Sequence, residues 1–177
     1  MSGEDILAFW FYRPEQWFAR SEEFDQAIRD AFASVWQQAA QGELHAWRAT
    51  LRGRLAEIIV LDQFSRNLHR ASPLAFAQDG MAVVLTQEAL RDEEFAALSD
   101  SERQFALMPL MHSESRVIHA EAVPLFARYT NAYVLDFELR HKAIIDRFGR
   151  YPHRNAVLGR TSTAEEAAFL QEPGSSF

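Results

Sequence analysis

Residues Arg54–Leu68 read RLAEIIVLDQFSRNL, and this stretch predicts the centre of the fold. At about 100° per residue, its apolar side chains surround nearly the whole helical wheel. A helix of this kind packs inside a protein, where other helices cover it. Asp62 falls beside Ile58 and Ile59, and Arg66 lies one turn further along the same face. We therefore expect Asp62 and Arg66 to be buried and paired.

Helix signals continue on both sides of this stretch, and no segment alternates convincingly as a strand does. N-cap residues and capping boxes mark the expected helix starts, and glycine or proline marks the ends. The pattern predicts one all-α domain over residues 1–177, built of antiparallel helical hairpins. The predicted helices cover residues 2–13, 21–41, 54–68, 72–91, 99–109, 113–129 and 131–148, with a short last helix capped by Thr163 and Glu166.

Composition narrows the possible function classes. The 177 residues are 48% hydrophobic and 24% charged, which is typical of a globular domain with a substantial core. The absence of cysteine excludes disulfides and thiolate metal ligands. No apolar run approaches the roughly 20 residues of a membrane span, and the first residues lack the basic start of a secretory signal. We expect a cytoplasmic protein without a membrane partner. The net charge of −7 also disfavours nucleic acid as a partner.

One basic segment contrasts with this acidic background. Residues 147–155 read RFGRYPHRN, and residues 140–160 carry six Lys or Arg against a single acid, Asp146. Guanidinium groups match the geometry of carboxylates and phosphates, and close arginines repel one another unless an acid or a bound anion offsets them. The segment therefore predicts a small anion or an acidic peptide as ligand. The principal hydrogen-bond donors to this ligand are expected to be Arg147, Arg150 and Arg154. His153 is expected to assist them, with a charge that depends on pH.

Other polar residues fall on the inner faces of predicted helices. His141 lies within the apolar stripe of the 131–148 helix, and Glu114 and Glu121 lie on the inner face of the 113–129 helix. Burying an isolated charge is costly, so these groups should meet each other, the basic segment or a ligand. The candidate ligand-binding residues are Asp62, Gln63, Arg66, Asn67, His112, Glu114, His141, Arg147, Arg150, His153, Arg154 and Asn155, and the catalytic candidates among them are His112, Glu114 and His141.

Each candidate also fits a purely structural interpretation. Asp62 and Arg66 match an ordinary ion pair one helical turn apart, and His141 matches a core histidine with a local hydrogen bond. Arg147 and Arg150 match caps of the preceding helix's last carbonyls. Several inward charges and a basic segment together exceed what one structural ion pair requires, and this convergence favours a site.

Three function classes fit these residues. The favoured one is a binding module that captures a small anion or an acidic peptide through the arginines. The second is an enzyme with His112 or His141 as general base, oriented by Asp62 or Glu114, and with the arginines stabilising the transition state. The third is a metal site, because Glu138 and His141 form one E-x-x-H motif; a di-iron bundle needs two. We predict no metal and no cofactor.

Five blocks of sequence carry a family resemblance: ILAFWF (6–11), LDQFSRN (61–67), MPLMHSE (108–114), RFGRYPHRN (147–155) and LGRTST (158–163). Through these blocks and the closing Phe177, the chain resembles the bacterial family catalogued as domain of unknown function 924. The resemblance implies an all-helical fold similar to the right-handed tetratricopeptide-like superhelices, and no established activity. The chain departs from the family pattern at Ser65, Ala71 and His119, where Pro, Gly and Gln are expected.

Overall fold

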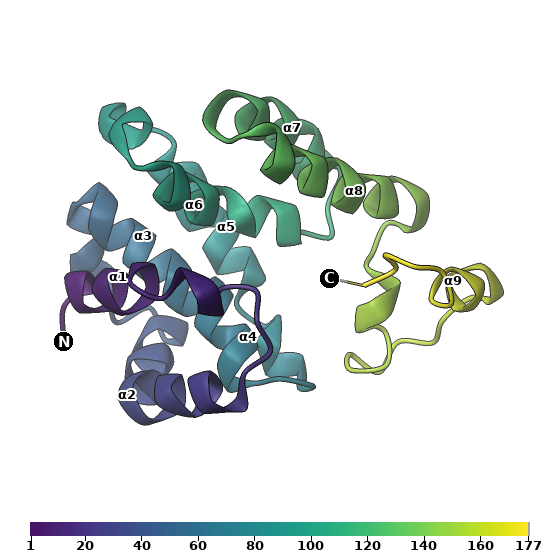
Figure 1. Cartoon of the computed structure of the whole chain (residues 1–177), viewed down its shortest axis with the longest axis horizontal. Coiled ribbons are helices and arrows are strands. Elements are labelled where there is room, and N and C mark those ends of the chain that lie inside the picture. The colour runs from purple at the N-terminus through teal and green to yellow at the C-terminus, as the bar shows by residue number, and fades with distance from the viewer. Residues whose placement is uncertain (177) are drawn as a thin grey trace.

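The structure, a computed structural model, describes residues 1–176, and every regular element in this range is helical (Figure 1). The all-α prediction is confirmed. Phe177, which belongs to the family resemblance, lies outside the described residues. The α-helices are α1 (Gly3–Phe11), α2 (Glu22–Ala40), α3 (Leu51–Ile59), α4 (Ser65–Leu68), α5 (Asp79–Ala89), α6 (Asp100–His112), α7 (Arg116–Tyr129), α8 (Ala132–Phe148) and α9 (Ala164–Phe169). Short 3-10 turns lie at Pro14–Gln16, His45–Ala49, Pro73–Ala75, Glu93–Ala97 and Pro152–Arg154.

The predicted central helix is central. Helix α3, a π turn at Val60–Phe64 and α4 form one continuous helical stretch, in which every residue from Leu55 to Phe64 is buried. Helices α1, α2, α5 and α6 all pack against it. The stretch begins before Arg54 because the Thr50 side chain accepts a hydrogen bond from the Gly53 amide and caps the first turn.

The π turn is accompanied by side-chain hydrogen bonds at its end. Ser65, where the family pattern has proline, donates to the carbonyl of Leu61 and accepts a hydrogen bond of 2.7 Å from the indole Nε1 of Trp36. The hydroxyl thus ties α2 to the central helix inside the core. Widened turns of this kind interrupt the regular hydrogen-bond ladder and are frequent at functional sites.

Local capping signals place most helix starts correctly. The capping boxes predicted at Ser2, Ser99 and Thr163 are all formed. Gly149 ends α8 in the left-handed conformation, with φ of 71°, which glycine adopts without strain. Ala71, where the family pattern has glycine, also has a positive φ of 56°.

Besides the start of the central stretch, three predicted boundaries are wrong. Helix α6 continues through Pro109 and ends at His112. Ser72 caps only the short turn that begins at Pro73, and α5 starts later, at Asp79. Helix α7 starts at Arg116 with Ser115 as its N-cap. Glu114 therefore lies in the connection before this helix rather than on its inner face.

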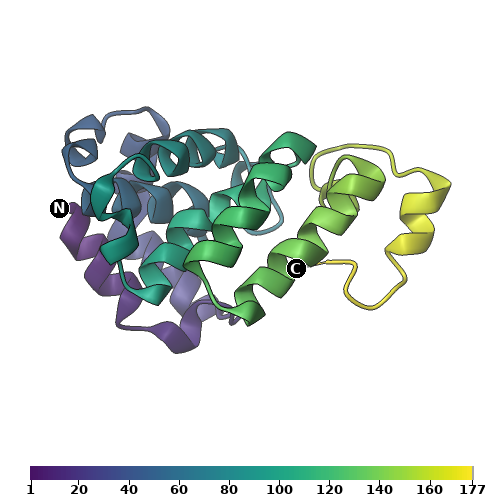
Figure 2. The same cartoon turned by 90° about the horizontal axis from the view of Figure 1, so that it is seen from above.

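The later helices pack in chain order. Helices α5, α6, α7 and α8 each contact the next, and α7 and α8 form an antiparallel pair joined by residues 130 and 131. The N-terminus and α9 lie at opposite ends of the molecule (Figures 1 and 2).

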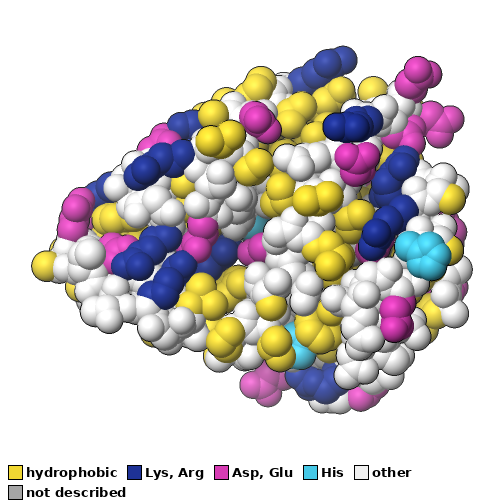
Figure 3. Space-filling view, turned by 180° about the vertical axis from the view of Figure 1, so that it is seen from behind, with side chains coloured by type: hydrophobic (Ala, Val, Ile, Leu, Met, Phe, Trp, Pro, Cys, Tyr) yellow, Lys and Arg dark blue, Asp and Glu magenta, His cyan; other side chains and the backbone are white. Residues whose placement is uncertain are grey.

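The main core spans α1 to α8, whereas a small second core joins the end of α8 to α9 through Ile144, Ile145, Tyr151 and Phe169. On the face seen in Figure 3, basic and acidic side chains are interspersed.

Candidate functional site

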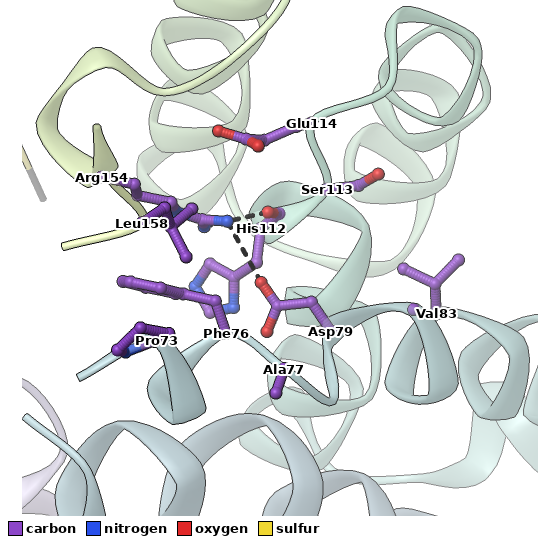
Figure 4. Close-up of a pocket in the computed structure, with 11 residues that line it drawn as sticks. Pro73, Phe76, Ala77, Asp79, Val83, His112, Ser113, Glu114, Arg154 and Leu158 are labelled. Carbon is purple, nitrogen blue, oxygen red and sulfur yellow. Dashed lines mark hydrogen bonds and ion pairs between the residues drawn. The ribbon is translucent and has the colours of Figure 1, made fainter. Parts of the chain in front are cut away.

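A pocket of about 290 Å³ opens where the start of α5, the end of α6 and the segment after α8 meet. Its walls come from stretches far apart in sequence, and the side chains of Phe76, Asp79, His112 and Arg154 converge on it (Figure 4). The lining combines apolar and charged groups from Pro73, Phe76, Ala77, Asp79, Gly80, Val83, His112, Ser113, Glu114, Arg154 and Leu158.

The pocket residue His112 contacts the buried carboxylate of Asp62. The Nδ1 atom of His112 lies 2.7 Å from Oδ1 of Asp62, which is fully buried on the π turn. The same carboxylate contacts Arg66 at 3.0 Å and accepts a hydrogen bond of 2.6 Å from Gln63. The predicted pairing of Asp62 with Arg66 is thus confirmed. It forms within a larger network that includes the end of α6.

This network fixes the charges of the two acid–base groups. Burial alone would raise the pKa of Asp62, but Arg66 and the hydrogen bonds from His112 and Gln63 outweigh it and hold this pKa below its usual value. Burial, assisted by the nearby charge of Arg66, lowers the pKa of His112 despite the opposing effect of Asp62. At neutral pH an ionised Asp62 therefore faces a neutral His112. Because a carboxylate only accepts hydrogen bonds, the proton of His112 sits on Nδ1 and Nε2 keeps its lone pair.

Asp79 joins two arginines across the pocket. Its carboxylate accepts hydrogen bonds from both terminal nitrogens of Arg66, at 3.0 and 3.1 Å, and from Arg154 at 3.1 Å. Arg154 also donates to the carbonyl oxygen of His112 at 3.0 Å, and its guanidinium lies over the rings of Phe76 and Tyr151. The arginine predicted from the basic segment is therefore a wall of the pocket. Its Nε is buried and has no hydrogen-bond partner among the described residues.

A second carboxylate lines the opposite part of the pocket. Glu114 accepts two hydrogen bonds from Arg160, at 2.6 and 2.9 Å, and one of 2.6 Å from the backbone amide of Tyr151. Partial burial favours the neutral form of Glu114, yet these hydrogen bonds and the charge of Arg154 lower its pKa. Glu114 thus anchors the segment after α8 to the end of α6.

The basic segment is better compensated than its sequence indicates. Arg147 pairs with Glu165 at 2.9 Å, and Arg150 makes two hydrogen bonds, of 2.6 and 2.7 Å, with Glu166. The expectation that these arginines lack nearby acids is wrong, because the chain folds back and α9 brings both glutamates to them. Neither Arg147 nor Arg150 lines the pocket, and both act as ties to α9.

Other candidates lie away from the pocket. Asn67 donates to Asp25 on α2, and Asn155 donates to Ser162 and Glu166 beside α9. His141 is buried and its Nδ1 lies 2.7 Å from the carbonyl oxygen of Phe137; burial lowers its pKa to about 3.

His153 is half-buried, and burial together with Arg154 lowers its pKa to about 4. Neither His141 nor His153 lines the pocket, and the Nδ1 of His153 has no hydrogen-bond partner in the described range. The prediction that Glu121 points inward is wrong, because α7 buries the face that carries His119, Ala122 and Phe126 and leaves Val117 and Glu121 exposed.

Glu138, one of the two residues of the E-x-x-H motif, contacts a histidine of the neighbouring helix. Glu138 is buried, with its Oε1 2.7 Å from Nδ1 of His119 on the neighbouring helix α7. Within residues 1–176, no three His, Cys, Asp or Glu side chains gather as a metal site would require. His119, where the family pattern has glutamine, is thus one of the contacts that join α7 and α8.

Sequence reasoning missed several residues of the pocket. Asp79 and Phe76 come from a helix start and a turn whose side chains have no periodic signal, and only the fold brings them to His112 and Arg154. Arg160, outside the pocket lining, was missed as the partner of Glu114 for the same reason. One available clue was the imbalance of charge in residues 140–160, because so many arginines require acids from elsewhere in the chain.

Comparisons with known proteins place the chain among relatives without an assigned activity. The family model described as "Bacterial protein of unknown function (DUF924)" matches residues 6–174. A solved structure of a protein of unknown function from Agrobacterium tumefaciens is similar, with 34% sequence identity, a TM-score of 0.91 and coverage of 96% of both chains. No curated protein matches. None of the helices within residues 1–176 is long and apolar enough to cross a membrane, and the cytoplasmic location stays a prediction.

Proposed function

The chain belongs to the DUF924 family of bacterial proteins of unknown function, and from the pocket that it carries we propose an acid–base site for a small molecule, with His112 as the proton acceptor. The observation that carries this proposal is the 2.7 Å contact between His112 Nδ1 and the buried carboxylate of Asp62. A carboxylate in this position fixes the tautomer and the orientation of the ring, and it stabilises the imidazolium that forms when Nε2 takes a proton.

The protonation states support this role. The lowered pKa of His112 keeps its imidazole neutral near pH 7, as a general base requires. The lowered pKa of Asp62 keeps a negative charge behind it. Arg154 supplies a buried positive charge on the pocket wall, where it would stabilise negative charge that develops on the substrate. The pocket volume of about 290 Å³ lies at the lower end of ligand sites, which favours a small metabolite.

Diethyl pyrocarbonate tests the proposal without knowledge of the substrate, because among histidines it acylates those whose imidazole nitrogen is accessible and neutral. Peptide mass spectrometry should show modification of His112 in the folded protein, and a slower rate in Asp62→Asn. His119 is fully buried and should stay unmodified. Glu114→Gln is the matched control, since Glu114 lines the same pocket but bonds to Arg160 and Tyr151. An unreactive His112, or equal rates in Asp62→Asn and the control, would refute the proposal.

A second candidate function is binding of a small anion, or of the carboxylates of an acidic peptide, without chemistry. The observation that favours it is Arg154, whose guanidinium lies over two aromatic rings and whose Nε has no hydrogen-bond partner within residues 1–176. Phosphate, sulfate or acetate should then raise the melting temperature at constant ionic strength. We expect Arg154→Ala to abolish this gain in melting temperature. Arg150→Ala should retain it, because Arg150 bonds to Glu166 and not to the pocket. A melting curve that none of the anions shifts would exclude this function.

We also propose that the consecutive pairs α5–α6 and α7–α8 form part of a tetratricopeptide-like right-handed superhelix. The support is their order along the chain, the two-residue connection of α7 to α8 and the packing of each helix on the next. Such superhelices present concave surfaces to ligands, and the pocket at the ends of α5 and α6 agrees with this use.

A further inference from the structure

A second pocket, of about 210 Å³, lies between α2 and the end of α4. Its lining comes from Arg29, Ala33, Trp36, Gln37, Leu68 and His69, none of which lines the first pocket. Its volume is below the usual range for drug-sized ligands, so its occupant would be small.

One wall of this pocket consists of two rings. The ring centroids of Trp36 and His69 are 4.3 Å apart, and their planes are inclined by 58°. The indole Nε1 of Trp36 already donates to Ser65 inside the core, so the part of Trp36 that lines the pocket is apolar. Aromatic rings favour offset or edge-to-face contacts with another ring. The wall therefore fits a flat aromatic ligand.

Two polar groups at the pocket can donate hydrogen bonds to a ligand: the solvent-exposed Arg29, and His69 in the tautomer with its proton on Nε2. The Nε2 atom of His69 is buried and has no hydrogen-bond partner within residues 1–176, although a buried ring nitrogen normally has one. Burial, together with the charge of Arg29, lowers the pKa of His69, so its ring is neutral at pH 7 and carries one N–H.

Arg29 is the second of these groups. It donates to the Gln26 side chain at 2.9 Å and to the Leu68 carbonyl at 3.3 Å. A guanidinium has five N–H donors, so three remain. No Asp or Glu in the described part of the chain forms an ion pair with Arg29, whereas Arg70 nearby pairs with Asp25. Arg29 is thus an uncompensated cation beside an unsatisfied histidine.

We propose that this second pocket binds a small aromatic carboxylate. The ring of the ligand packs against Trp36 and His69, and its two carboxylate oxygens accept hydrogen bonds from Arg29 and from the Nε2–H of His69. One carboxylate offers the two acceptors that these groups lack, and a neutral aromatic ligand would leave the charge of Arg29 without a partner.

Benzoate is the probe, and the indole N–H signal of Trp36 in proton–nitrogen NMR spectra is the readout, assigned with Trp36→Phe. Benzoate should shift this signal saturably. Benzamide, which keeps the ring without the charge, and acetate, which keeps the charge without the ring, should each bind at least about tenfold more weakly. Arg29→Gln should weaken benzoate binding by about tenfold or more, and His69→Phe, which keeps a ring but removes Nε2, should also weaken it.

Arg91→Gln is the matched control, because it removes the same charge from an exposed arginine of the 90–92 turn that lines neither pocket. This variant should bind benzoate as the wild type does. A signal that benzoate does not shift saturably, equal affinities for benzoate and benzamide, or equal affinities of Arg29→Gln and Arg91→Gln would each overturn the proposal. Because none of these residues touches the first pocket, the outcome is independent of the role of His112.

Discussion

Among single residues, Asp62 is a fully buried charge on which three polar side chains depend. Arg66, Gln63 and His112 all direct polar atoms at this one fully buried carboxylate. Removing one partner of a buried network leaves the others desolvated and unpaired, which costs more than the network itself contributes.

Asp62→Ala should therefore destabilise the protein by roughly 3 to 5 kcal/mol. The measurement is the free energy of unfolding in urea, with Asp146→Ala as control. Asp146 is exposed, and its carboxylate pairs with Lys142 in the preceding turn, so its loss should cost less than about 1 kcal/mol. Equal effects of the two substitutions would contradict the importance assigned to the buried carboxylate.

Ala71 has a strained backbone conformation. Its φ of 56° lies in the left-handed region, which costs a residue with a Cβ about 1 to 2 kcal/mol, whereas glycine adopts it freely. Ala71→Gly should therefore raise the free energy of unfolding by about 0.5 to 1 kcal/mol, since the greater freedom of the unfolded chain offsets part of the gain. Ala127→Gly, at an exposed position inside α7, is the control and should destabilise by about 1 kcal/mol. A lower melting temperature for Ala71→Gly would show that the strain is not relieved.

At the scale of elements, α9 is held by one strong and one weak ion pair. Arg150 meets Glu166, whose side chain is only 3% exposed, whereas Arg147 meets Glu165, whose side chain is 63% exposed. Exposed pairs contribute little because water screens them. Arg150→Ala should therefore accelerate amide hydrogen exchange in residues 160–176, while Arg147→Ala should leave it nearly unchanged. Equal exchange in the two variants would mean that the small apolar core alone holds α9.

The same contact should respond to acid. Arg150 and the backbone amide of Thr163 hold the pKa of Glu166 at about 2, below its ordinary value of 4.5. A carboxyl group whose pKa is lower in the folded state stabilises the fold above its unfolded pKa, and this contribution disappears as the pH falls. Protection of α9 should thus decrease between about pH 4.5 and pH 2. In Glu166→Gln this additional decrease should be absent.

The elements also show which inferences a sequence supports. Periodicity and capping are local, so they correctly placed α1, α2 and α8, and periodicity predicted the burial of Asp62 on the central stretch and of His141 on α8. Which face of a helix is buried depends on its neighbours, and α7 buries His119, Ala122 and Phe126 instead of the face that carries Glu121.

The sequence carries no local signal for contacts between residues that lie far apart in the chain. Asp79 meets Arg154 over 75 residues of chain, and the basic segment finds its acids on α9. The sequence therefore identified His112, Glu114 and Arg154 as candidates, but it paired the other arginines with a ligand instead of with the chain itself.

At the scale of the whole molecule, the two apolar cores should unfold together. The segment after α8 is tied to the main core by Arg154 with Asp79, by Glu114 with Arg160, and by the hydroxyl of Tyr151 with the Met111 carbonyl. We propose that residues 1–177 form a single cooperative unit.

All four tryptophans precede residue 50, so their fluorescence reports on the main core. Hydrogen exchange of residues 140–170 in urea reports on the second core. The urea midpoints of the two signals should coincide in the wild type. They should separate in Arg154→Ala, which lacks the ion pair with Asp79. Separate midpoints in the wild type would divide the chain into two units.

The ties across the pocket also set the order in which the protein becomes complete during its synthesis. Ribosomes release a chain from its N-terminus, and helices α1 to α6 contain their own packing partners. The first pocket, in contrast, needs Arg154 and Leu158, which emerge after nearly all of the main core. In a nascent chain arrested before these residues, His112 and Asp79 are therefore not covered by Arg154 and Leu158. The proposed ligand site at the first pocket would thus be complete only after residues 154–158 have left the ribosome.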